Sequence, residues 1–513
     1  MFSNNTWRQE RTDPYSNQEI LSVCLRLLTG RRPRVRELFF NFVYLERATG
    51  ESIAHAITEC LRQNHIDISQ ARVQSYDGAA CMSSAKMGVQ ARIRQLSPRA
   101  LYVHCNSHVL NLSIASACKQ PAIRNMIDIL NAVFLFFDLS PKRQRFLERI
   151  LDNMAPTTRK KKLVGLCKTR WVERHTCFDT FYDMYGYLCE CLEAILDPSG
   201  YPDIYMDTWT GSRDQETRTK AQALLASMCS SQTIIAFLVT KNALENVRPI
   251  ASKLQKRDLD IHQAYGMIDQ TKARIVTLRK DIEEEFSVWF EDATRLATLV
   301  GIPISAPRAP KSARQLHRLN APSTTPSEYF LRNVAIPFCD HLSSEFANRF
   351  TPETRKDVEI LALLPPNITK TEDVQKVVEN LKFWEEDLPN PPTLRAEIKE
   401  WQRFWNTKMP MEPASSLNLV DCLDNADEDV FPNLNTLLRI GCILPVGSCE
   451  AERSFSCLRR LTTYLRNRMG ENRLTGLALM NMNHDIDIGL DKVCQAFIQR
   501  HIRKMFAGCI LSQ

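Results

Sequence analysis

Cysteine and histidine side chains, the usual ligands of zinc in proteins, gather near residue 105. Cys105 and His108 form a C-x2-H pair, and His104 and Cys81 lie nearby in the sequence. A structural zinc site needs four such ligands, commonly arranged as two closely spaced pairs. Because no second pair stands at a suitable spacing, metal binding is the weaker interpretation of this motif, and a separate zinc finger is not expected.

Two carboxylates, Asp77 and Glu452, lie next to predicted apolar elements, where a charged side chain is unusual. Asp77 follows a short predicted strand, residues 72–76, although Asp77-Gly78 by itself is typical of a turn. Glu452 lies at the head of an apolar stripe on a predicted helix. A carboxylate that faces inward requires a cation or hydrogen-bond donors, whereas a first-turn glutamate can simply interact with the helix dipole. The stripe consists of Phe455, Leu458, Leu461 and Leu465.

The composition bounds the kind of protein. The chain has 513 residues, of which 44% are hydrophobic and 24% charged, as in globular proteins rather than disordered chains. The length suggests roughly two to four domains, or one large fold with an insertion. A net charge of +7 favours polyanionic partners such as DNA without requiring one. The basic run Arg159-Lys160-Lys161-Lys162 fits a nuclear localisation signal, a phosphate-contacting loop or a solvated loop.

The cysteine content indicates a reducing compartment. There are 17 cysteines, an odd number, without a repeating CxxC framework. The sequence from Met1 to Thr6 has no signal-peptide pattern, and no apolar run approaches the roughly 18 residues that span a bilayer. We therefore expect reduced thiols, many of them in the core, in the nucleus or cytosol, and no membrane partner.

The first 105 residues alternate between strand and helix patterns. Period-two alternation predicts strands, a spacing of three to four predicts helices, and Gly30 to Pro33 has the composition of a turn. Such alternation is typical of an α/β fold. The expected strands span 21–28, 35–45, 72–76 and 100–104, and the expected helices span 52–62 and 89–96.

The rest of the chain is predicted to be mostly helical. Proline-rich residues 302–326 read as a linker or an exposed loop, and acidic residues 421–429 as a loop. A last strong helix is expected over residues 449–466, followed by further apolar helices. The other helical stretches expected are 109–195, 244–299 and 329–405.

Four segments, in this order and with a long gap before the last, resemble the hAT family of cut-and-paste DNA transposases. The resemblance covers nearly the whole chain. It is strongest to the branch of domesticated vertebrate proteins that includes the repressor of the inhibitor of the interferon-induced protein kinase and the MYM-type zinc-finger proteins. The segments are 75–80 (SYDGAA), 105–112 (CNSHVLNL), 169–171 (TRW) and 452–456 (ERSFS).

The resemblance implies a fold of α/β plus mostly helical class, in which an RNase H-like core is interrupted by a large all-α insertion. Residues 1–176 would form the first part of this core, with its first strand missing or degenerate. Residues 177–425 would form the insertion, and residues 426–513 would complete the core and carry the hAT dimerisation region. Asp77 and Glu452 are then expected to face one cleft.

The resemblance also implies a site. In the family, two aspartates and a glutamate hold two divalent metals that activate the nucleophile and stabilise the leaving oxygen, and carboxylates suit Mg²⁺. Asp77 matches the second aspartate and Glu452 the glutamate. Gln9 stands at the position of the first aspartate, and no apolar strand is expected between Met1 and Arg8. Glu10 and Asp13 are acidic but lack the strand setting.

Two further family positions carry over. Arg170 and Trp171 match positions near the DNA end, where an aromatic side chain can stack on an unpaired base; a half-buried structural tryptophan is the other interpretation. The motif of Cys105 and His108 opens a helix beside the core in the family.

We expect a transposase-derived nuclear protein, catalytically inactive because one ligand is lost, that associates with itself. Apolar residues from Leu434 to Met482 would exceed what one helical pair can bury, which favours an interface. Double-stranded DNA is a second candidate partner. No cofactor is expected, except Mg²⁺ if the site is competent. The alternatives are an active transposase with a truncated N-terminus and a helical interaction scaffold that does not bind DNA.

Overall fold

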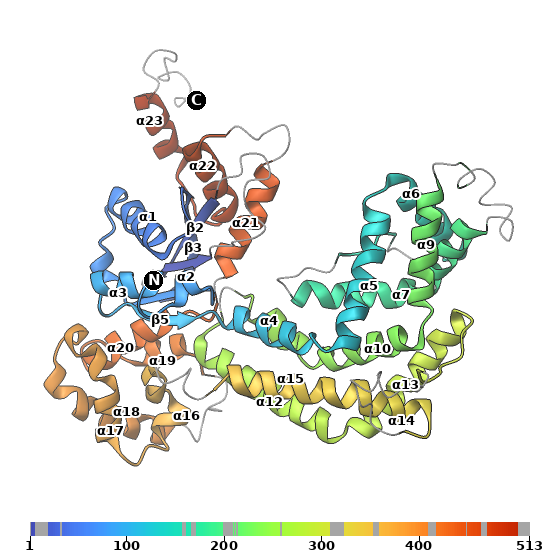
Figure 1. The fold of residues 1–513 in the computed structure, drawn as a ribbon. Coiled ribbons are helices and arrows are strands. Elements are labelled where there is room, and N and C mark those ends of the chain that lie inside the picture. The colour runs from blue at the N-terminus through green and yellow to red at the C-terminus, as the bar shows by residue number, and fades with distance from the viewer. Residues whose placement is uncertain are drawn as a thin grey trace. The chain divides into compact units, whose positions relative to one another are not determined.

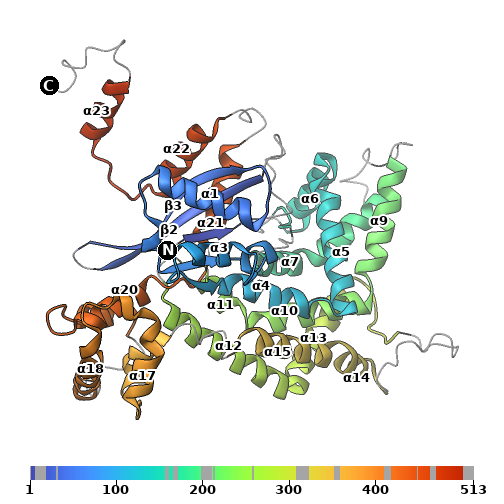
Figure 2. The same cartoon turned by 60° about the vertical axis from the view of Figure 1, so that its left-hand side comes forward.

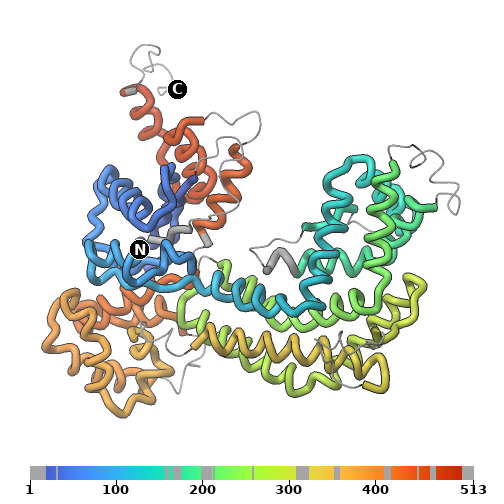
Figure 3. Tube along the Cα trace, in the orientation of Figure 1, coloured from blue at the N-terminus to red at the C-terminus, as the bar shows by residue number. Residues whose placement is uncertain are grey.

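The computed structural model describes most of the chain. The residues described are 2–5, 19–30, 33–155, 161–165, 171–197, 209, 211, 214–256, 259–307, 323–351, 359–408, 417–447, 449–462 and 469–500. Internal contacts divide the chain into two compact units. Unit 1 comprises residues 1–104 and 442–513, and unit 2 comprises residues 105–441. Figure 3 follows the chain from the N-terminal strands of unit 1, through unit 2, to the C-terminal helices of unit 1.

Among the described residues, unit 1 contains one five-stranded mixed sheet with the order β3-β2-β1-β4-β5 (Figure 1). Strand β2 runs antiparallel to both β1 and β3, whereas β1, β4 and β5 are mutually parallel. The strands are β1 (Phe2–Asn5), β2 (Glu19–Thr29), β3 (Arg34–Leu45), β4 (Val73–Tyr76) and β5 (Leu101–His104). The four strands expected from the sequence are all present, with ends shifted by a few residues.

The β2–β3 hairpin follows from its sequence. Both strands contain nearly continuous apolar runs, as expected where both faces of a sheet are covered. Successive side chains point to opposite faces, so Leu21 and Val23 enter one apolar cluster and Ile20 and Cys24 the other. Gly30 at the turn has φ of 85°, a conformation that costs glycine little. The register shifts between Val23 and Cys24. This irregularity lets Phe39 and Phe42, three positions apart, pack into the same cluster on one face of the sheet.

Helices cover both faces of the sheet (Figure 2). On one face, α1 (Gly50–Gln63) and α3 (Val89–Leu96) bury an apolar cluster that includes Leu21, Val23 and Ile57. On the other face, α21 (Cys449–Leu461) and α22 (Glu471–Met482) pack over Ile20, Cys24 and Phe42. The C-terminal part of the chain therefore completes the core begun by the N-terminal part. Short elements η1 (Ile68–Gln70) and α2 (Ala80–Ser83) join the strands, and α23 (Leu490–Arg500) ends the described chain.

Strand β1 was not predicted from the sequence. No apolar strand was expected between Met1 and Arg8, yet Phe2–Asn5 pairs with β2 and with β4 at the centre of the sheet. The strand is only four residues long and reads Phe-Ser-Asn-Asn, so neither length nor apolar alternation distinguishes it in the sequence. The first strand is therefore present, although it is short and mostly polar.

Unit 2 is helical throughout its described residues. Helix α10 (Ser231–Glu245) lies at its centre and packs against α5, α7, α9 and α13; its side chains are apolar almost all round, as expected of a buried helix. The others are α4 (Asn106–Ala117), α5 (Pro121–Asp138), α6 (Pro141–Met154), α7 (Trp171–Leu196), α9 (Gln215–Met228), α11 (Arg248–Lys253), α12 (Ile261–Lys280), α13 (Ile282–Leu299), α14 (Pro326–Phe330), η5 (Leu331–Ala335), α15 (Ile336–Arg349), α16 (Pro365–Ile368), α17 (Val374–Leu381), η7 (Lys382–Asp387), η8 (Pro391–Thr393), α18 (Leu394–Lys408), α19 (Leu419–Asn425) and, at its end, α20 (Pro432–Cys442).

No single described helix is long and apolar enough to cross a membrane. Helices α9 and α10, bent by 66° at their junction, meet that criterion only as a pair, by length and composition.

Two sequence-based boundaries differ from the structure. The core was expected to extend to residue 176, but the helices after β5 pack within unit 2, where α4 contacts α15 and α5 contacts α10. The loop expected over residues 421–429 is in part helix α19. Asn418 and Asp421 form a reciprocal capping box at its start, so the first acidic residue of that run stabilises a helix instead of a loop.

Candidate functional site

Asp77 lies directly after β4 in unit 1, at the end of a strand whose four residues are all buried. Its side chain is only 8% exposed. The carboxylate Oδ1 accepts a hydrogen bond from the backbone N–H of Ala79 at 3.2 Å, so Asp77 does form the turn that Asp-Gly indicates. The Tyr102 hydroxyl donates to the Asp77 carbonyl oxygen at 3.4 Å. Strand β4 and this turn thus fix the carboxylate at the edge where the parallel strands end.

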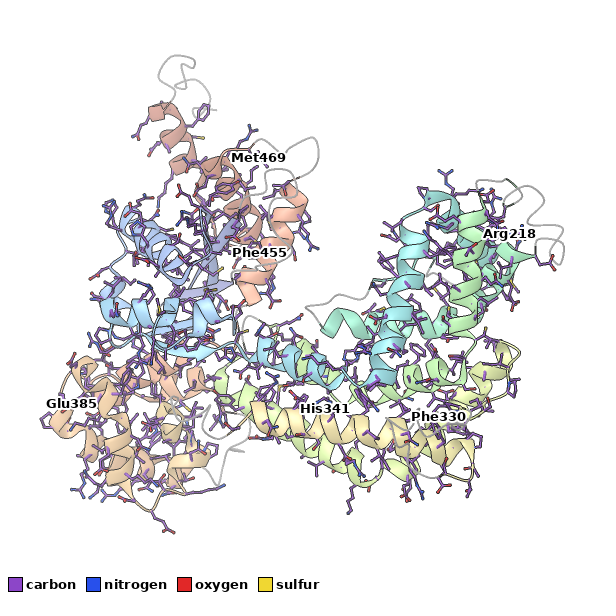
Figure 4. The ribbon with its side chains drawn as sticks, in the orientation of Figure 1. Arg218, Phe330, His341, Glu385, Phe455 and Met469 are labelled. Atoms are coloured by element: carbon purple, nitrogen blue, oxygen red, sulfur yellow. The ribbon has the colours of Figure 1, made fainter. Side chains whose placement is uncertain are left out.

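Glu452 lies in the first turn of α21, and 7% of it is exposed. The helix is held on the sheet by a buried hydrogen bond in which the Ser454 Oγ lies 2.6 Å from the Ser22 Oγ. Phe455, one residue further, is directed toward the sheet (Figure 4) and packs on Phe42 with ring centroids 6.2 Å apart. These contacts determine where the carboxylate of Glu452 stands.

The two carboxylates interact. The pKa of Asp77 is raised from 3.8 to about 6, first by burial and further by the negative charge of Glu452, while the Ala79 hydrogen bond opposes the shift. Asp77 and Glu452 thus belong to the same compact unit, and the charge of Glu452 affects Asp77, although the sequence separates the two residues by most of its length.

The first ligand position is not described. Strand β1 pairs with β4 up to Asn4 and Tyr76, so β1 ends beside the strand end that precedes Asp77. Gln9, which matches the family's first aspartate by resemblance, lies outside the described residues, as do Glu10 and Asp13. Within the part of the chain that the structure describes, no three Asp, Glu, His or Cys side chains are grouped to hold a metal.

A buried ionic cluster lies beside Glu452 and was not predicted from the sequence. Arg26 of β2 and Glu37 of β3 form an ion pair at 3.7 Å, with both side chains about 3% exposed. Glu450 and Arg453 of α21 form a second pair at 2.9 Å, and Glu450 is fully buried. The Arg26 Nη2 also donates to the Cys442 carbonyl at 3.5 Å.

This cluster has an electrostatic cost. Burial raises the pKa of Glu37 from 4.5 to about 7; Arg26 and Arg453 lower it, and Glu450 raises it. Arg26 and Glu37 are partners in the β2–β3 register. The signal in the sequence was a basic residue inside one apolar strand and an acidic residue in the next, but Arg34 and Arg36 on β3 obscure it. Through these contacts, Cys442 before α21 and the first turn of α21 are held against the β2–β3 hairpin. The cluster therefore helps to fix the position of Glu452, which lies in the same turn.

The C-x2-H motif caps a helix. Cys105 lies just before α4, and its Sγ accepts a hydrogen bond from the backbone N–H of His108 at 3.4 Å. This contact satisfies one of the N–H groups that a helix start leaves without an intrahelical partner. The arrangement agrees with a helix-opening role for both residues.

The candidate DNA contacts are only partly described. Arg170 lies outside the described residues, and Trp171 is the first residue of α7, with its side chain outside the description. In the basic run, Lys161 pairs with Asp152, and Lys162 pairs with Asp138 at 3.0 Å. All four of these side chains are exposed by a third or more, which is typical of solvated surface pairs.

Comparison with known families gives two matches. Residues 393–486 match the hAT family C-terminal dimerisation region, and residues 9–88 match the ZMYM1/FAM200 RNase-like domain. The first match includes α21 and Glu452, and the second includes β2, β3 and Asp77. Both carboxylates of the candidate site thus lie within matched segments.

Two curated relatives carry the same name, 52 kDa repressor of the inhibitor of the protein kinase. The human protein is 27% identical over 494 residues, which is 95% of this chain and 63% of the relative. The mouse protein is 27% identical over 493 residues, with the same shares of both chains. This chain therefore spans about 63% of the length of the relatives it matches. The resemblance to hAT-derived proteins is confirmed by these matches.

Proposed function

With a hAT dimerisation region at one end and an RNase-like match at the other, we propose that this chain is a transposase-derived protein that has lost DNA cleavage and acts by associating with itself. The supporting observation is an exposed apolar stripe on α23, immediately after the matched dimerisation region.

The core is proposed to be RNase H-like. The sheet order β3-β2-β1-β4-β5, with only β2 antiparallel to its neighbours, supports this assignment. So do the helices on both faces and the acidic residue at the end of β4. In such a core the metal ligands stand where β1 and β4 end, and Asp77 and Glu452 are at this edge. Their proposed role is that of the second and third members of a carboxylate triad.

The chemistry is proposed to be lost. Two-metal catalysis at phosphorus needs enough negative charge to hold both cations, and Gln9, which matches the family's first aspartate, is neutral. If a third carboxylate were provided by Glu10 or Asp13, Asp77 and Glu452 would help to hold Mg²⁺ ions, and those ions would stabilise the attacking and leaving oxygens. The two retained carboxylates favour this second candidate, an active hAT-type transposase, and cleavage assays decide between the two.

The interface is proposed to lie further along the chain than the sequence suggested. Most apolar residues of the 434–482 stretch are buried within the chain, so they do not form a surplus patch. Among the described residues of the stretch, Ile443, Leu461, Leu477 and Leu479 are half-buried, and Met480 is exposed at 63%. The interior residues include Leu434, Leu437, Leu438, Leu444, Phe455, Leu474 and Ala478.

The exposed apolar residues are concentrated in α23 instead. Leu490 is 81% exposed, Val493 is 49% and Phe497 is 52%. Their spacing of three and four places them, with Ile498, on one helical face. An amphipathic helix whose apolar face meets solvent normally marks an interface. A second copy of the chain is the proposed occupant, because the stripe begins four residues beyond the match to a dimerisation region.

Light scattering tests this interface. The wild type is expected to have the mass of a dimer or larger at micromolar concentration, and the double variant Leu490→Glu, Phe497→Glu the mass of a monomer. Two other exposed valines, Val276 on α12 and Val288 on α13, provide the matched control when both are replaced by glutamate. A monomeric wild type, or equal dissociation of both double variants, contradicts the proposed interface.

The nucleus is the proposed location, supported by the basic run at residues 159–162. Double-stranded DNA is the proposed second partner, supported by the net charge of +7. The relatives' printed name also suggests a regulatory role through protein contacts. Binding to duplex DNA that weakens steeply with added salt supports the DNA partner; binding absent at low salt favours a scaffold that acts on proteins alone.

A further inference from the structure

Two cysteines of unit 2 are in sulfur–sulfur contact. Cys189 lies on α7 and Cys229 is the C-terminal cap residue of α9. Their Sγ atoms are 3.9 Å apart, although the residues are 40 positions apart in the sequence. Both residues are free cysteines, not a disulfide.

The neighbouring contacts fix both sulfur atoms. The Tyr185 hydroxyl, one turn before Cys189, donates to the Met228 carbonyl oxygen at 2.9 Å. The backbone N–H of Cys229 donates to Leu225 O at 2.8 Å. Helices α7 and α9 pack along their lengths. The two thiols are therefore held together by the fold instead of meeting by side-chain motion.

The two thiols differ in access to solvent. Cys189 is buried, with 2% exposure, whereas Cys229 is partly exposed. The hydrogen bond with Cys189 lowers the pKa of Cys229, against the effects of burial and of Glu193. The same contact raises the pKa of Cys189. Because the thiolate is the reactive form of cysteine, Cys229 is the one prepared to react with a solute, and Cys189 is placed to resolve the product.

We propose that Cys229 and Cys189 form a reversible oxidation site for hydrogen peroxide. The Cys229 thiolate attacks a peroxide oxygen, the O–O bond breaks, and protonation of the released hydroxide gives one water beside the Cys229 sulfenic acid. The Cys189 thiol then attacks the sulfenic sulfur. An S–S bond forms, the S–O bond breaks, and the hydroxyl group leaves with the Cys189 proton as a second water. Two thiols lose two electrons and the peroxide gains them.

The closure needs little movement. A disulfide joins sulfurs at about 2.05 Å, so the Sγ atoms must approach by about 2 Å, within the reach of small side-chain rotations. The bond would fasten α7 to the junction between α9 and α10. Since α10 is the central helix of unit 2, the oxidised form is expected to be held more rigidly at that junction. Reduction by a dithiol such as dithiothreitol would release it.

The test uses the full-length reduced protein. It is treated with stoichiometric hydrogen peroxide, alkylated, digested and examined by mass spectrometry. The expected result is a linked peptide pair containing Cys189 and Cys229, formed before the partly exposed Cys494 is oxidised. In Cys189→Ala, the sulfenic acid on Cys229 is expected to persist and to be trapped by dimedone. Cys191→Ala, two residues away and fully buried, is the matched control and is expected to behave as the wild type.

Other outcomes overturn the proposal. Oxidation of Cys494 with Cys229 still reduced would show that the pair has no special reactivity. Linked peptides that mainly join other cysteines would show that this contact is only packing. The wild-type experiment decides the matter even if the alanine variants do not fold.

Discussion

The hydroxyl oxygens of Ser22 and Ser454 lie 2.6 Å apart in the buried layer between β2 and α21, although 432 positions separate them in the sequence. The Ser454 hydroxyl donates to the Ala451 carbonyl oxygen and so accepts a hydrogen bond from Ser22, whose Oγ also lies 3.8 Å from the Cys24 sulfur. The segment that follows the helical unit is therefore bound to the first hairpin by polar contacts as well as by apolar packing.

This contact predicts a measurable coupling. Ser22→Ala and Ser454→Ala each remove one partner of a buried hydrogen bond, and each is expected to lower the unfolding free energy of unit 1 by about 1–2 kcal/mol. The double variant is expected to lose less than the sum of the two, since neither hydroxyl is then left without its partner. Urea unfolding followed by circular dichroism measures all four proteins. Strict additivity would contradict a direct bond.

The buried ion pair predicts a larger effect. Glu37→Gln leaves the charge of Arg26 in the interior without its ion-pair partner, which typically costs about 3–5 kcal/mol. Replacing both residues by apolar side chains, Arg26→Met with Glu37→Leu, is expected to recover most of that loss. The urea midpoints of these variants provide the measurement. A loss below about 1 kcal/mol in Glu37→Gln would show that the pair is solvated.

The pKa of Asp77 predicts a pH dependence. Its folded value of about 6 lies above the ordinary 3.8, so between these values the folded state holds the proton that the unfolded state has lost. This carboxylate therefore destabilises the fold increasingly as the pH rises from about 4 to about 6, by at most about 3 kcal/mol. Asp77→Asn keeps an oxygen for the Ala79 N–H and removes the charge.

The variant is accordingly expected to be more stable than the wild type at pH 8 and similar at pH 4. The comparison must be made between the two proteins at each pH. Burial lowers the pKa of His175 to about 4, so that residue increases the stability of both proteins as the pH rises through the same range. A stability difference that does not change with pH would show that the carboxylate of Asp77 is not perturbed.

Most secondary structure of unit 1 could be predicted from its apolar pattern, which is two long apolar runs around a Gly-Pro turn for the hairpin and a spacing of three to four for the helices. The β2–β3 hairpin and helices α1 and α3 follow from that pattern. Strand β1 could not, because four mostly polar residues carry no periodic signal, and its place depends on pairing with β2 and β4. Acidic residues 421–429 were predicted as a loop because the sequence does not distinguish Asp421, which caps helix α19, from a surface aspartate in a loop.

The site was only partly predictable. Asp77 and Glu452 were singled out by resemblance, and their local settings alone also fit a turn and a helix start. No spacing rule brings together residues so far apart; that depends on α21 packing against the hairpin. The ionic cluster of Arg26, Glu37, Glu450 and Arg453 was missed because charged residues are expected at the surface unless their partners are known.

The most direct test of the account is DNA cleavage by the full chain. Supercoiled plasmid and duplexes carrying the parent transposon ends would be incubated with the wild type and with Asp77→Ala, in Mg²⁺ and in Mn²⁺. Because the neutral Gln9 stands where the family has its first aspartate, we predict no nicking or joining above the level of Asp77→Ala. Reproducible nicking by the wild type that Asp77→Ala abolishes would contradict it, and would identify Glu10 or Asp13 as the third ligand of a working transposase.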